Sequence, residues 1–261
     1  MVVYSRWIVQ SDMALGIVCR AVVWLICAIS TVQVIAQKPA GRDYSRLNTF
    51  SGFFEYSNDS SHIILGTVSN RKIGAIGFQY QRRLFQRRYL DFSYQAEIRP
   101  GMVESDPTAS YAFIETAPAA VTIPTHNVSP VSQCSAGDHG PFTDPLLGDT
   151  YYVRVTCSRR SVVEQGFSPG GIRINIMPRH RLQTTLSSNA GYVFSTQPVP
   201  VNNAGSFNFC FDFGGGLEWF YSRRASVRVE YQVQHLSNKN TADVNPGTDS
   251  GFVRLTYAFG R

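Results

Sequence analysis

The feature that most constrains this chain is a two-residue alternation of apolar and polar side chains that recurs in eight segments after residue 45. Successive side chains of a strand point to opposite faces, so each segment predicts a β-strand with one apolar and one polar face. The apolar face is aliphatic and aromatic without interruption, and the other carries Asp, Glu, Arg, Gln or Asn at nearly every step. The segments are residues 49–56, 73–81, 89–98, 170–177, 182–194, 207–220, 226–238 and 250–259.

These eight segments predict an all-β fold, an eight-stranded antiparallel transmembrane β-barrel of the outer membrane. Eight strands leave a narrow interior that side chains must fill, and charged and amide side chains fill it by pairing with one another. The apolar face then points to lipid, and the segment lengths suit tilted membrane strands. The alternative is a soluble lipocalin-like barrel or β-sandwich, which would also expose a polar face.

Composition agrees with a membrane protein that crosses with strands. Charged residues make up 16% of the chain, against about 25% in typical soluble domains. No run of about 20 apolar residues follows residue 40, which argues against a helical membrane protein. Arginine pairs at 82–83, 87–88 and 159–160 lack interleaved aromatics, so no nucleic-acid partner is expected. Contact with lipid phosphates and a solvated turn both remain open for these pairs.

The first 36 residues have the layout of a secretory signal. Arg20 precedes an apolar run over residues 21–35, and Val34 and Ala36 are suited to signal peptidase cleavage after Ala36. A retained membrane anchor is the alternative. We therefore expect a cleaved signal peptide over residues 1–36, export to the outer membrane, and a single barrel domain over residues 37–261.

Connections between the predicted strands alternate in length, with residues 101–169 as a long extracellular insertion. In small outer-membrane barrels short turns face the periplasm and long loops face outside. The insertion is too long for a bare loop, so a small cap is expected, stapled by a Cys134–Cys157 disulfide in an oxidising compartment. Cys210 stands alone in a strand. No Cys/His cluster has metal-ligand spacing, and neither metal nor other cofactor is expected.

Three reactive side chains meet near the end of the chain. His235 and Ser237 share a strand face, and the following loop brings Asp249 back towards His235. A serine, a base and an acid on the lipid-facing side suggest an esterase that acts on lipid. Asn238, Asn240 and Asn245 offer donors for an oxyanion or for positioning. The bland alternative is a polar strand end that meets lipid headgroups.

The sequence His235-Leu-Ser237-Asn238, followed by Asn245 and Gly247, resembles the PagL-type lipid A 3-O-deacylases over residues 226–259. The resemblance implies Ser237 as nucleophile, His235 as general base and acid, and Asp249 as orienting carboxylate. Asp249 stands where that family has glutamate. Lys239-Asn240 replaces a pair of small residues, and Lys239 could contact a lipid A phosphate.

The implied activity is hydrolysis of an acyl ester of lipid A, with outer-leaflet lipopolysaccharide as partner and substrate arriving from the membrane. Two other functions stay open: a non-catalytic barrel with a structural or adhesive role through its long loop, and an esterase for phospholipids. The acyl position cleaved and a homodimeric state are also open.

Overall fold

The computed structural model describes residues 44–58, 64–66, 70–115, 121–124, 129–131, 134–144 and 148–261. The signal-peptide prediction lies outside these residues. Within them, no helix is long and apolar enough to cross a membrane. The strands are β1 (Asn48–Ser57), β2 (Lys72–Gln86), β3 (Leu90–Glu115), β4 (Val121–Pro124), β5 (Ser129–Pro130), β6 (Gly137–Thr143), β7 (Thr150–Ile176), β8 (Leu182–Ser195), β9 (Phe207–Phe220), β10 (Ala225–Ser237) and β11 (Thr248–Gly260).

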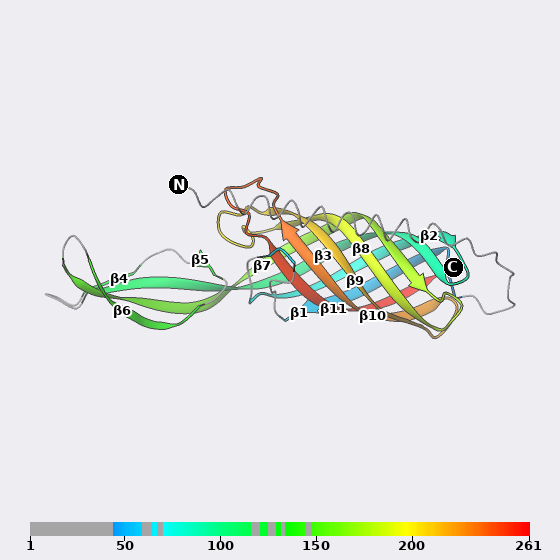
Figure 1. Ribbon diagram of the computed structural model, residues 1–261, viewed down its shortest axis with the longest axis horizontal. Coiled ribbons are helices and arrows are strands. Elements are labelled where there is room, and N and C mark those ends of the chain that lie inside the picture. Colours follow the sequence, from blue (N-terminus) through cyan, green and yellow to red (C-terminus); the bar gives the residue numbers. More distant parts are fainter. Residues whose placement is uncertain are drawn as a thin grey trace. The chain divides into compact units, whose positions relative to one another are not determined.

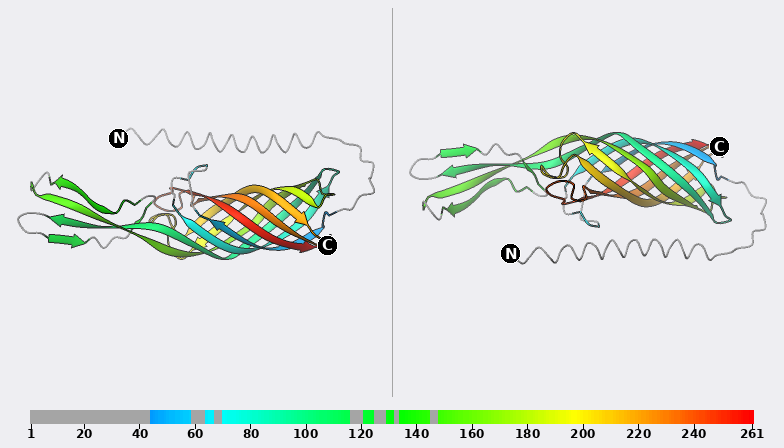
Figure 2. Two further views of the ribbon diagram at one scale, coloured as in Figure 1. Left: turned by 90° about the horizontal axis from the view of Figure 1, so that it is seen from below. Right: turned by 90° about the horizontal axis from the view of Figure 1, so that it is seen from above.

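Eight of these strands close into a ring of antiparallel neighbours, β1-β2-β3-β7-β8-β9-β10-β11, with β11 paired back to β1 (Figures 1 and 2). Thr49 pairs with Gly260 at the closure, so the barrel wall has no free edge there. Each predicted segment corresponds to one of these strands. Short connections at residues 87–89, 177–181 and 221–224 occupy one end, and the longer ones occupy the other.

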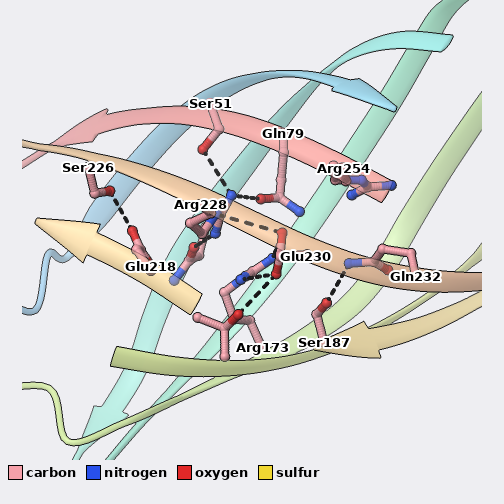
Figure 3. Close-up of polar contacts among 12 residues, drawn as sticks. Ser51, Gln79, Arg173, Ser187, Glu218, Ser226, Arg228, Glu230, Gln232 and Arg254 are labelled. Atoms are coloured by element: carbon pink, nitrogen blue, oxygen red, sulfur yellow. Dashed lines mark hydrogen bonds and ion pairs between the residues drawn. The ribbon is translucent and has the colours of Figure 1, made fainter. Parts of the chain in front are cut away.

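Ion pairs fill the barrel interior. Glu55 accepts hydrogen bonds from Arg99 Nε (2.7 Å) and Arg254 Nε (2.8 Å), and Arg254 also donates to Glu97 (2.8 Å). All four side chains are buried. Figure 3 shows a second part of this network, in which Arg228 donates to Gln79 and Arg173 to Glu230. Because unpaired buried charges are costly, this mutual pairing is what lets polar side chains occupy the interior.

The outer surface is apolar, and side chains such as Phe54, Leu255 and Tyr257 are exposed on it. A soluble barrel or sandwich places its apolar side chains inside, so this arrangement excludes the lipocalin-like alternative. An apolar exterior around a polar interior is the architecture of a transmembrane β-barrel. The fold prediction is confirmed.

The long insertion differs from the cap expected for it. Strands β3 and β7, of 26 and 27 residues, run on past the barrel rim and pair with each other up to Glu115 and Tyr151. Strands β4 and β5 add to β3, and β6 adds to β7, which makes an arm from residues 106–160 (Figure 1). Cys134 and Cys157 form a disulfide in this arm. The insertion is therefore largely a continuation of two barrel strands rather than a separate small cap.

Candidate active site

His235 and Asp249 form the centre of the site. They are direct cross-strand partners in the β10–β11 register, and Nδ1 of His235 lies 2.6 Å from Oδ1 of Asp249. Asp249 is fully buried, whereas the His235 side chain is 21% exposed. With Nδ1–H donated to the carboxylate, Nε2 of the neutral ring keeps its lone pair. The imidazole is thus oriented as a base.

The second oxygen of Asp249 is bound by a segment that the sequence did not point to. The backbone amides of Ile64, Leu65 and Gly66, between β1 and β2, all donate to Oδ2 at 2.5, 2.7 and 2.9 Å. Asp249 has the outward parity of Val253, yet the segment covers it. Backbone amides carry no side-chain signature, so no residue type in the sequence could have revealed this contact.

Ser237 lies two residues after His235 on β10, about 7 Å away along the strand. Its Oγ accepts hydrogen bonds from Asn245 Nδ2 (3.0 Å) and from the backbone N–H of Lys239 (3.1 Å). It also lies 3.1 Å from Asn245 Oδ1, to which it donates. No hydrogen bond joins Ser237 to His235 in the described part of the chain.

Asn238 holds the β10–β11 loop rather than facing the site. Its Nδ2 donates to the carbonyl oxygens of Val244 (2.7 Å) and Ala204, and its Oδ1 accepts from the Asn240 amide (2.9 Å). Both Nδ2 hydrogens are therefore used. The Asn240 side chain is exposed, and the backbone N–H of Asn240 donates to Asn238 Oδ1. Of the three predicted asparagines, only Asn245 places a side-chain donor at Ser237.

Lys239 and Asn240 both have left-handed backbone conformations, with φ of 53° and 61°. This turn directs the Lys239 N–H back at Ser237 Oγ, while the Lys239 side chain is exposed. Gly247 also has a positive φ, 62°, and a Cβ there would lie 3.4 Å from Cε1 of His235. The backbone of this loop therefore lies close around the Ser237 hydroxyl and the His235 imidazole.

An aromatic surface borders the site on the barrel exterior. Phe211 pairs with His235 and Phe209 with Ser237 across the β9–β10 ladder, and both rings are exposed. Two further rings continue it: the half-buried Phe207 contacts Phe209, and the exposed Phe194 contacts Phe207. The alternation of β9 was visible in the sequence, but its position beside Ser237 depends on the strand register. No three His, Cys, Asp or Glu residues of the described ranges are placed to hold a metal ion.

One comparison with known proteins covers the residues of this site. A family model described as lipid A 3-O-deacylase (PagL) matches residues 141–258, which include His235, Ser237, Asn245 and Asp249. The match confirms the resemblance over that part of the chain. Residues 64–66 lie outside it. A search of curated proteins found no match.

Solved structures similar to this chain are outer-membrane proteins. The crystal structure of the outer membrane enzyme PagL is 12% identical, with a TM-score of 0.46, and the alignment covers 81% of this chain and 99% of that one. Neisserial surface protein A is 8% identical, with a TM-score of 0.39 and coverages of 82% and 97%. OprG from Pseudomonas aeruginosa is 10% identical, with a TM-score of 0.37 and coverages of 85% and 99%.

Proposed function

We propose that this protein is an outer-membrane esterase that hydrolyses an acyl ester of lipid A. Its residues 141–258 match the lipid A 3-O-deacylase (PagL) family model. The observation that carries the proposal is the His235–Asp249 pair, at 2.6 Å, two residues from Ser237 on the lipid-facing side of the barrel. All three residues fall within the matched region.

In the proposed reaction, Ser237 is the nucleophile and His235 the general base. Nε2 of His235 takes the Ser237 proton as Oγ attacks the ester carbonyl, and Asp249 stabilises the imidazolium that forms. His235 then returns the proton to the departing sugar oxygen. Water, activated by the same imidazole, hydrolyses the acyl-enzyme and releases the fatty acid.

The tetrahedral oxyanion needs donors beside Ser237. The Lys239 amide and Asn245 Nδ2 already lie 3.1 and 3.0 Å from Oγ, so both can donate to an oxygen that forms close to it. We assign Asn238 and Asn240 to positioning, because their hydrogen bonds hold the loop that carries these donors.

The substrate reaches this site sideways, through the membrane. Phe209 and Phe211 flank Ser237 and His235 on the exterior, where an acyl chain can lie against them. The exposed ammonium of Lys239 is suited to a phosphate of lipid A. The longer connections lie at this end of the barrel, which supports a site in the outer leaflet, where lipid A resides.

The proposal is tested by mass spectrometry of lipid A after incubation with folded protein. Wild type should remove one acyl chain and Ser237→Ala none. Ser188→Ala, the same change on the outward face of β8, should act as wild type. Acyl release from phospholipids but not lipid A would assign a phospholipid esterase. An unchanged acyl pattern with both lipids would leave the non-catalytic barrel, with the arm as its functional part.

A further inference from the structure

Asp249 has more hydrogen-bond donors than an orienting carboxylate needs. Oδ1 faces His235, and three consecutive amides, from Ile64, Leu65 and Gly66, converge on Oδ2. The carboxylate therefore cannot rotate to exchange its oxygens without breaking three hydrogen bonds. The three amides belong to the connection between β1 and β2, about 185 residues before Asp249 in the sequence.

The three amides stabilise the negative charge of Asp249. The residue is fully buried at the outward face of the barrel, where an ionised carboxylate without donors would be unfavourable. Successive backbone N–H groups that converge on one oxygen supply positive partial charge without a competing cation. They hold the carboxylate ionised and keep Oδ1 aimed at His235.

We propose that residues 64–66 are a positioning element of the catalytic site, acting on His235 through Asp249. This inference rests on the proposed function and extends it to a part of the chain outside the family match. The three residues do not contact the substrate in this assignment. They fix the acid, the acid fixes the imidazole, and the imidazole then presents Nε2 to Ser237.

Gly66 provides the sharpest test. A Cβ on Gly66 would lie 2.4 Å from the Asp249 nitrogen and 2.7 Å from the Thr248 carbonyl carbon, and neither backbone atom can yield. Gly66→Ala must therefore lift the segment away from Asp249. Gly74 in β2 is the matched control, because a Cβ there meets nothing within 4 Å.

The experiment measures kcat and KM for lipid A, and the labelling rate of Ser237 by a fluorophosphonate, each per folded molecule. Folded protein is quantified from its heat-modifiable gel mobility. Gly66→Ala should lower kcat and the labelling rate by about ten- to a hundredfold, with KM within twofold of wild type. A merely structural role would reduce the folded fraction without changing these rates. Gly74→Ala should match wild type.

A second pair of variants removes one donor. Leu65→Pro lacks the backbone N–H and Leu65→Ala retains it, so the proline variant should be at least tenfold slower per folded molecule than the alanine variant. This pair decides the question if Gly66→Ala does not fold. An active wild type with Gly66→Ala at the wild-type rate, or with equal rates for the two Leu65 variants, overturns this inference alone. A wild type that neither cleaves lipid A nor labels at Ser237 overturns the proposed function and this inference together.

Discussion

His235 and Asp249 lie directly opposite each other in the β10–β11 register, with Nδ1 and Oδ1 2.6 Å apart. An aspartate therefore spans the distance to the imidazole from this strand position. The second carboxylate oxygen accepts hydrogen bonds from three backbone amides. The carboxylate is therefore held between His235 and these amides, which leaves no room for a longer side chain.

Changing the acid should therefore reduce activity even when the change is small. Asp249→Asn replaces one carboxylate oxygen by an NH₂ group. That donor then faces another donor, either the His235 N–H or the three backbone amides, so the hydrogen bonds on that side are lost. We expect kcat to fall by about 10²- to 10⁴-fold. Asp249→Glu should also lose at least tenfold, because the added methylene cannot fit between fixed partners. The assay is lipid A deacylation, and the exposed Asp243→Asn is the control. Wild-type activity for Asp249→Asn would remove this residue from the mechanism.

Gly247→Ala should impair catalysis beyond its effect on stability. The positive φ of 62° costs an alanine about 1–2 kcal/mol, and its Cβ would press on the His235 ring. Gly148 has a similar φ, 76°, with open space around it in the arm, so Gly148→Ala carries the strain without the contact. Steady-state kinetics should show a lower kcat for Gly247→Ala alone. Equal kcat values for the two variants would contradict this account.

The exposed aromatic surface beside the site should determine substrate affinity. Removing the ring of Phe211 deletes apolar area next to His235, and we expect KM for lipid A to rise by about tenfold, with kcat little changed. Trp219→Ala, an exposed aromatic at the other end of β9, serves as the comparison and should leave KM unaltered. A similar rise in KM for both variants would indicate general damage to the membrane-facing surface.

The interior ion pairs should dominate the stability of the barrel. Arg254→Ala removes one of the two arginines that Glu55 and Glu97 share and leaves only Arg99 to both, which should cost about 3–5 kcal/mol of unfolding free energy. Urea unfolding in detergent micelles, followed by tryptophan fluorescence, measures this loss. Arg154 forms an exposed pair with Asp138 in the arm, so Arg154→Ala should leave the midpoint unchanged. A midpoint for Arg254→Ala equal to that of wild type would refute the argument.

Strand alternation was sufficient to predict the barrel because one face of its strands is consistently apolar and the other is polar at nearly every step. The arm gave no comparable alternation, so the extension of β3 and β7 past the barrel was not predicted, although the run Tyr151–Tyr152–Val153 has the aromatic and β-branched residues of a strand. The position of the insertion was thus predicted from the sequence, and its strand structure was not.

The candidate site was predictable as far as side chains define it. Parity placed His235 and Ser237 on one face, and the hairpin returned Asp249 to them. Which asparagine reaches Ser237 depends on loop geometry, and Asn238 and Asn245 could not be separated by spacing. The amides of residues 64–66 were invisible because every residue type supplies the same donor.

The ion pairs that cross the lumen have an electrical consequence. Arg99, Glu55, Arg254 and Glu97 occupy the middle of the barrel as a solid cross-section of opposite charges, each neutralised by its neighbours. These buried guanidinium and carboxylate groups occupy the lumen at this level, so we expect the folded protein to conduct few ions across a membrane.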